Sequence, residues 1–180
     1  MSINETQYFP SEFKAPFKSE NENVVAVISD NKPAPHVEDV LISEASKLGM
    51  PTYQISNWST VETQDLFASL KSDLCVMAFV EAYIPKKILD TPWIGCIQFH
   101  PSLCPLYRGP SAMSWAIANG EKFTGCTIHF VNKFLDSGKI IVQKKVRVRK
   151  NDDPKSIKKK VLKMEHEIYP QAIFDVLSNL

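Results

Sequence analysis

The chain has 180 residues, 44% hydrophobic and 23% charged, which is ordinary for a globular protein large enough to bury one core. Its net charge of +1 gives no overall field that favours nucleic acid or an anionic membrane. No apolar run approaches the roughly 20 residues of a membrane span, and residues 1–23 do not resemble a signal peptide, so we expect a cytoplasmic protein.

Strands and helices are predicted to alternate along the first two thirds of the chain. Short runs rich in β-branched residues predict strands, and apolar residues at helical spacing predict helices. In chain order these are strand 24–29, helix 36–48, strand 52–55, helix 61–70, strand 74–80, helical turns 84–89, strand 96–99 and helix 111–119.

The last third predicts two strands and a long helix. Strands 124–131 and 140–148 are joined by a loop. Apolar and polar residues alternate in the second strand, which is typical of a strand near the edge of a sheet. Asp152, Asp153 and Pro154 are typical of a helix start, and Pro170 is predicted to kink or divide that helix.

This alternation predicts an α/β fold with an open, mostly parallel, doubly wound (Rossmann-like) sheet and helices on both faces. Residues 1–23 are polar and lack glycine, so we expect a degenerate segment there, the remnant of a first strand and helix. Residues 24–180 are expected to form the catalytic domain.

Polar side chains end the predicted strand 96–99. Alternation along a strand places Gln98 and His100 on the same face, and Pro101 ends the strand. Ligands bind outside the carboxyl ends of strands in open α/β sheets, so both residues are candidates for a site. On spacing alone, a hydrogen-bonded structural histidine is an equally good interpretation.

The loop between the last two strands contains Asp136, followed by Ser137 and Gly138. This composition is typical of a turn whose aspartate accepts local backbone hydrogen bonds. The alternative is a carboxylate that orients and charges His100. Together with Gln98, the pair would supply an oxyanion donor, an acid/base and its electrostatic partner, three parts of acyl transfer.

Other candidate constellations are weak. The scattered cysteines favour free thiols in a reducing compartment, and no second ligand pair accompanies His100 and Cys104, so we predict no metal. No glycine-rich phosphate loop is present, which argues against a nucleotide cofactor. The remaining histidines show no partner in the pattern and are assigned no role: His36, His129 and His166.

Five motifs occur in order: Gln98-Phe99-His100, residues 101–109 (PSLCPLYRG), Trp115, residues 124–129 (TGCTIH) and residues 135–138 (LDSG). Through them the chain resembles the N-terminal, folate-binding domain of the formyltransferase family. That family includes glycinamide ribonucleotide, methionyl-tRNA and sugar formyltransferases and the hydrolase domain of 10-formyltetrahydrofolate dehydrogenase. The motif sequences of this hydrolase domain are the most similar to those of the chain.

The resemblance implies a metal-free reaction on 10-formyltetrahydrofolate. It implies that His100 shuttles a proton, that Asp136 positions His100 and an ordered water, and that Gln98 donates to the oxyanion. The pterin would lie against two backbone segments, namely Ala82, Tyr83 and Ile84, and Asn132, Lys133, Phe134 and Leu135.

We therefore expect formyl transfer to a small amine, an amino sugar or amino metabolite. Gln98 stands where most transferases of the family have asparagine, which favours the alternative of a hydrolase with water as acceptor. The unrecognisable first strand leaves a second alternative, a catalytically lapsed folate-binding protein. The neutral net charge and the absence of a C-terminal domain predict no tRNA partner, and no membrane partner is expected. The oligomeric state is not predicted.

Overall fold

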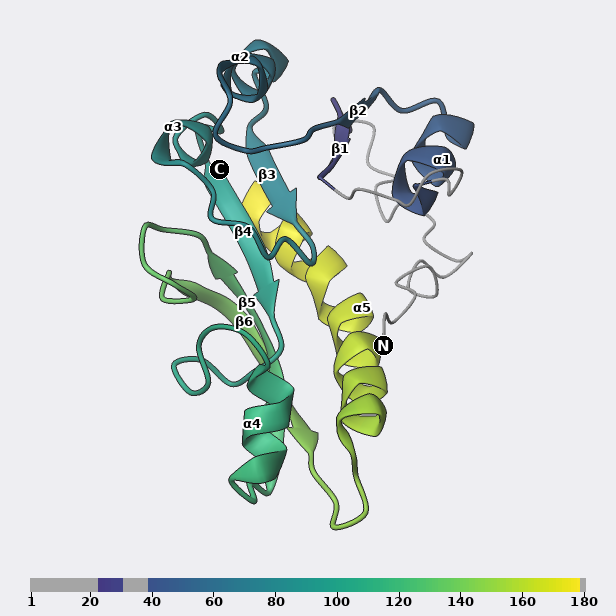
Figure 1. Cartoon of the computed structure of the whole chain (residues 1–180), viewed down its shortest axis with the longest axis vertical. Helices are drawn as coiled ribbons and strands as arrows, with labels where there is room; N and C mark the ends of the chain where they lie inside the picture. The colour runs from purple at the N-terminus through teal and green to yellow at the C-terminus, as the bar shows by residue number, and fades with distance from the viewer. Residues whose placement is uncertain (1–22, 31–38, 179–180) are drawn as a thin grey trace. The chain divides into compact units, whose positions relative to one another are not determined.

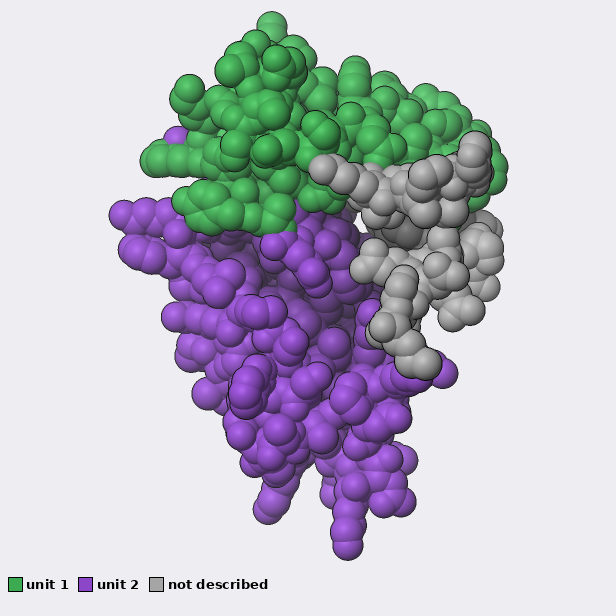
Figure 2. Space-filling model, in the orientation of Figure 1, with its two compact units in different colours: residues 1–72, 82–88 green, residues 73–81, 89–180 purple. Residues whose placement is uncertain are grey.

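The computed structural model describes residues 23–30 and 39–178, and the chain is drawn in Figure 1. Two compact units are distinguished in Figure 2: residues 1–72 with 82–88, and residues 73–81 with 89–180. Apart from Asn23, the predicted segment 1–23 lies outside the described residues, so its degenerate strand and the domain boundary stay predictions.

The first unit contains a small parallel sheet with its first helix packed against it. Its elements are β1 (Val27–Ser29), α1 (Val40–Lys47), β2 (Thr52–Gln54) and α2 (Val61–Leu70). The buried Asp39 caps α1 by accepting the backbone N–H groups of Leu41 and Ile42. Its other carboxylate oxygen accepts from Ser29 and Gln54, so one side chain joins the helix to both strands.

The second unit is built on a four-stranded sheet in the order β3-β4-β5-β6. Its strands are β3 (Leu74–Met77), β4 (Gly95–His100), β5 (Phe123–Phe130) and β6 (Ile140–Arg147). Its helices are α4 (Ala112–Ala118) and α5 (Pro154–Ser178). The short α3 (Lys86–Leu89) precedes β4 in the chain, and all of it but Leu89 belongs to the first unit. Strand β6 forms an edge of this sheet, as its alternating pattern predicted.

The α/β class is confirmed, but the prediction of a mostly parallel sheet is wrong. Strand β3 pairs parallel with β4, whereas the β4–β5 and β5–β6 pairs are antiparallel, so the sheet is mixed. For the β5–β6 pair, the physical reason is the connection at residues 131–139, which contains no crossover helix and therefore joins antiparallel neighbours. Helices on both faces of a single sheet remain a prediction.

Helix α5 packs along the sheet of the second unit (Figure 1). Ile157 and Val161 are buried on its inner face, and the Tyr169 hydroxyl donates to the carbonyl of Met77 in β3, 2.7 Å away. Pro170 was predicted to kink or divide this helix. It does not divide the helix, because buried residues on both sides keep the segment packed as one helix, and the kink stays a prediction. No helix in the described part of the chain has the length and apolarity of a membrane span.

One acidic side chain of α5 is buried. Glu165 is 4% exposed, and its Oε2 makes no hydrogen bond with any of the described residues. Burial penalises the charged carboxylate and raises the pKa of Glu165 from 4.5 to about 7. The Glu165 carboxyl therefore titrates in a pH range in which exposed glutamates are already ionised.

We predict that Glu165→Gln stabilises the protein at pH 8 and changes its stability little at pH 4.5. The folded chain retains the Glu165 proton between pH 4.5 and about 7 while the unfolded chain loses it, so stability falls as pH rises through this window. At 1.36 kcal/mol per pKa unit, the ionised group costs on the order of 3 kcal/mol above that window. Thermal unfolding at both pH values measures the effect.

The matched control is Glu167→Gln on the same helix, where the side chain is 46% exposed in an ion pair with Lys144. This variant should show no comparable gain at pH 8. A Glu165→Gln effect of the same size at both pH values would contradict the assignment.

Candidate active site

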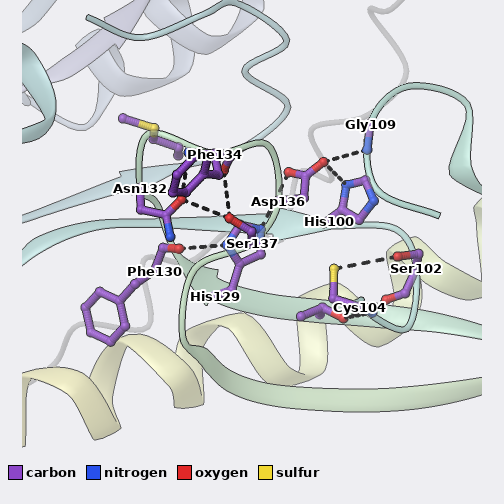
Figure 3. A network of polar contacts seen from close by, with 12 residues as sticks. His100, Ser102, Cys104, Gly109, His129, Phe130, Asn132, Phe134, Asp136 and Ser137 are labelled. Carbon is purple, nitrogen blue, oxygen red and sulfur yellow. Dashed lines mark hydrogen bonds and ion pairs between the residues drawn. The ribbon is translucent and has the colours of Figure 1, made fainter. Parts of the chain in front are cut away.

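His100 is the last residue of β4 and is buried. Its Nε2 lies 2.8 Å from the carbonyl oxygen of Tyr107, and because a carbonyl only accepts, Nε2 carries a proton. Its Nδ1 lies 3.3 Å from Oδ2 of Asp136 (Figure 3). Both ring nitrogens therefore face oxygen acceptors.

The loop at residues 101–109 is braced against the sheet. The buried Thr127 of β5 donates to the carbonyl of Ser102 and accepts the N–H of Cys104. Gln143 of β6 donates to the carbonyl of Cys104. These contacts fix the loop that presents the Tyr107 carbonyl to His100, so this part of the sequence motif has a structural role.

Asp136 reaches the site from the loop between β5 and β6. It is buried, and its Oδ2 accepts the backbone N–H of Gly109 at 2.8 Å (Figure 3). A turn aspartate bonding to its own neighbours was the simpler interpretation. Instead, its partner lies 27 residues earlier in the chain, on the loop that also holds His100.

The residues around this carboxylate have unusual backbone conformations. Asp136 has φ of 43°, Tyr107 of 55° and Ser111 of 59°, all in the left-handed region that non-glycine residues seldom adopt. At Gly138, an added Cβ would lie 1.6 Å from the carbonyl oxygen of Phe130. Only glycine therefore lets the Asp136 loop close onto the end of β5.

The surroundings of Asp136 favour its ionised form. Burial raises the pKa of the Asp136 carboxyl, but the neighbouring His129, the N–H of Gly109 and the charge of His100 together lower it below its usual value. The carboxylate is therefore available at neutral pH as a partner for an imidazolium.

A second histidine, to which no role was assigned from the sequence, also lies at this site. His129 of β5 is 2% exposed, and its Nε2 lies 3.7 Å from Oδ1 of Asp136. Its Nδ1 lies 2.8 Å from the carbonyl oxygen of Phe130 (Figure 3). Its place depends on the register of β5, in which His129 pairs with Gln98, and residue spacing does not reveal that register.

Gln98 lies two residues before His100 on β4 and is partly exposed. In the described part of the chain, its side-chain amide makes no hydrogen bond, so the amide is available to a ligand. The structure thus places Gln98 on the strand that carries His100 and pairs it with His129.

The predicted pterin-binding segments belong to different units. Residues 132–135 share the loop of Asp136, where Asn132 Oδ1 accepts from the N–H of Phe134 and from Ser137, and where Phe134 and Leu135 are exposed. Lys133 places its ammonium over the Phe134 ring. Ala82, Tyr83 and Ile84 belong to the first unit, and their part in the site stays a prediction.

No group of three or more histidine, cysteine, aspartate or glutamate side chains in residues 23–30 and 39–178 is arranged to hold a metal ion. The four cysteines are free thiols. The chemistry available at this site comes from imidazole, carboxylate and amide groups.

Comparison with known proteins identifies related sequences. Residues 5–173 match the family model described as formyl transferase. The methionyl-tRNA formyltransferase of Staphylococcus epidermidis (strain ATCC 35984) is 33% identical over 135 residues, which is 75% of this chain and 44% of that protein. The cytosolic 10-formyltetrahydrofolate dehydrogenase of Xenopus tropicalis is 32% identical over 124 residues, 66% of this chain and 14% of that protein.

A solved structure of similar fold is the phosphoribosylglycinamide formyltransferase from Anaplasma phagocytophilum. It superposes with a TM-score of 0.77 at 29% identity, over 88% of this chain and 75% of that one. The chain thus spans most of this structure but less than half of each of the two curated relatives.

We predict that Gly138→Ala displaces the Asp136 loop. The new methyl group has no room beside the Phe130 carbonyl, so the loop must move and the contacts of Asp136 with Gly109 and His100 are lost. We expect a loss of unfolding free energy on the order of 3 kcal/mol, measured by denaturant unfolding.

Gly120→Ala is the matched control. Gly120 has φ of +67° but nothing within 4 Å of an added Cβ, so only the backbone conformation opposes the substitution, at about 1 kcal/mol. Equal losses in the two variants would mean that the close approach at Gly138 does not matter.

Proposed function

Because the chain belongs to the formyl transferase family, we propose that it transfers the formyl group of 10-formyltetrahydrofolate to a small amine, an amino sugar or amino metabolite. The observation that carries the proposal is the contact of His100 with Asp136, which joins an acid/base group to a carboxylate. The unbonded amide of Gln98 on the same strand adds a candidate oxyanion donor.

The reaction forms one C–N bond and breaks another. The acceptor amine attacks the formyl carbon, the carbonyl oxygen gains negative charge, and the bond to N10 of the folate then breaks. The proton lost by the amine ends on N10. In the proposal, His100 gives its Nε2 proton to N10 and takes up the proton lost by the amine at the same nitrogen. The Gln98 amide donates a hydrogen bond to the oxygen as its charge develops.

Asp136 supports His100 electrostatically. Its lowered pKa keeps the carboxylate ionised at neutral pH, where it stabilises the ring of His100 when that ring is positively charged. In the resting structure, Nε2 of His100 is bonded to the Tyr107 carbonyl. Proton transfer to a substrate through Nε2 therefore requires that hydrogen bond to open.

The acceptor is the least constrained part of the proposal. By their names, the related proteins formylate methionyl-tRNA, phosphoribosylglycinamide and sugars. The net charge of +1 gives no field that favours tRNA or an anionic membrane, which supports a small amine as the acceptor. In the proposal, the reaction takes place in the cytoplasm and uses no metal.

Hydrolysis of 10-formyltetrahydrofolate is a second candidate. It is favoured by Gln98, which stands where most transferases of the family have asparagine. The identities of 32% to the 10-formyltetrahydrofolate dehydrogenase and 33% to the methionyl-tRNA formyltransferase do not separate the two reactions. The glutamine side chain is one methylene longer, so its amide would meet the formyl oxygen from a different position.

Incubation with 10-formyltetrahydrofolate alone distinguishes the two reactions. For a transferase we expect slow formate release without an amine and faster folate turnover, with little formate, when the correct amine is added. Rapid formate release that is insensitive to added amines would show that the reaction is hydrolysis rather than transfer. Folate binding without turnover under any condition would indicate a lapsed enzyme.

His100→Ala and Asp136→Asn are each predicted to lower turnover at least about 100-fold, because one removes the acid/base and the other its charge. Folate binding, measured by calorimetry, should change much less. His166→Ala, at an exposed histidine of α5, is the control and should retain wild-type turnover. A loss below tenfold at His100 or Asp136 would contradict its assigned role.

A further inference from the structure

Two free cysteines lie directly opposite each other in the sheet of the second unit, Cys75 on β3 and Cys96 on β4. We propose that this pair is an oxidation site, a dithiol that a peroxide converts into a reversible disulfide. All four cysteines lie within the described residues, and the other two have no cysteine opposite them. Cys126 of β5 pairs with Lys144, and Cys104 lies in the loop after β4.

The spacing of the two strands suits a disulfide. Hydrogen-bonded strands lie about 4.8 Å apart, and disulfides join Cα atoms that are about 4.4 to 6.8 Å apart. Residues opposite each other on neighbouring strands point to the same face of the sheet, so the Cβ atoms of Cys75 and Cys96 project together. The bond therefore needs only a small local movement of the sheet.

The two thiols differ in exposure. Cys75 is partly exposed, whereas Cys96 is 2% exposed and its thiol donates to the carbonyl of Leu89 at 3.7 Å. An oxidant from solvent therefore meets Cys75 first. Cys96 is the second thiol, held beside Cys75 by the pairing of the strands.

The two thiols also differ in acidity. When Cys75 ionises, the Cys96 thiol turns from Leu89 to the Cys75 sulfur, and this hydrogen bond lowers the pKa of Cys75 although burial opposes it. The same hydrogen bond, burial and the negative charges of Cys75 and Asp90 raise the pKa of Cys96. Tyr169 of α5 also lies near Cys75, and burial raises its own pKa. Cys75 is therefore the thiolate of the pair, and a thiolate is the form that attacks an oxidant.

The oxidation takes place in two steps. The Cys75 thiolate attacks one oxygen of hydrogen peroxide, the O–O bond breaks and hydroxide leaves, which gives a sulfenic acid at Cys75. The Cys96 sulfur then attacks the Cys75 sulfur, the S–O bond breaks, and the departing hydroxide takes the Cys96 proton to form water. Two thiols and one peroxide thus give one disulfide and two waters. Two molecules of a small thiol such as glutathione reverse the reaction by exchange.

A disulfide at this position acts on the candidate active site, and this part of the inference rests on the proposed function. Cys96 shares its face of β4 with Gln98 and His100. Met77, two residues after Cys75, pairs with Gln98. A covalent bond between the strands therefore shifts the backbone that places the Gln98 amide.

Counting thiols in the full 180-residue chain tests the oxidation site without any activity. Folded wild-type protein is treated with a few equivalents of hydrogen peroxide and then alkylated in denaturant. The count should fall from four free thiols to two, with the bond located between Cys75 and Cys96 by mass spectrometry, and dithiothreitol should restore all four. Four free thiols after treatment, a bond between other cysteines, or sulfinic acid at Cys75 without a bond would overturn the proposal.

Single variants separate the roles of the two thiols. Cys96→Ala leaves the Cys75 sulfenic acid without a second thiol, so dimedone should label Cys75 in this variant and not in wild type. Alkylation of Cys75 by iodoacetamide should also shift to higher pH, because the hydrogen bond from Cys96 is lost. Cys104→Ala, the control, keeps the pair and should match wild type. An unlabelled Cys75 with an unshifted profile in folded Cys96→Ala would contradict the roles, and if this variant does not fold, the wild-type thiol count decides.

Turnover of formyl-folate tests the link to the active site. After catalase has removed the peroxide, oxidised wild-type protein should turn over about 10-fold to 100-fold more slowly and recover with dithiothreitol. Cys75→Ala should be insensitive to the same treatment. Unchanged turnover in fully oxidised protein would overturn the link. If the reduced protein turns over no formyl-folate, the proposed function fails, and the thiol count alone decides the oxidation site.

Discussion

The carboxylate of Asp136 is the point at which three distant segments of the second unit meet. It accepts the N–H of Gly109, faces His100 through the same oxygen and faces His129 through the other. Without this acceptor, the Gly109 N–H would be buried without a partner. The geometry of both histidines therefore depends on one side chain and on the glycine that lets its loop close.

Local features of the fold could be predicted from the sequence. The helix expected at residues 61–70 coincides with α2, and the strand expected at 96–99 lies within β4, because periodicity and turn residues act over a few positions. Strand direction is not local in this way. The loop at 131–139 was nevertheless a sign of an antiparallel pair, since it contains no segment that could form a crossover helix.

The residues of the candidate site also differ in whether a local sequence pattern could predict them. Alternation along one strand was sufficient to group Gln98 with His100, whereas Asp136 was attached to them through the family resemblance rather than through spacing. The contacts with Gly109 and His129 depend on the register of β5 against β4, which no short motif encodes. Pro170 shows the opposite error, because a local rule was overridden by the packing of α5 on the sheet.

The left-handed conformations at Tyr107, Ser111 and Asp136 have a consequence for protein engineering. Substitution by glycine or asparagine at such positions is a standard route to a more heat-resistant protein. Here Tyr107 and Asp136 contact His100 directly. At Asp136, such a substitution would remove the carboxylate that faces His100, whereas at Tyr107 it would keep the main-chain carbonyl. Screens for a higher melting temperature on this scaffold should therefore also monitor ligand binding.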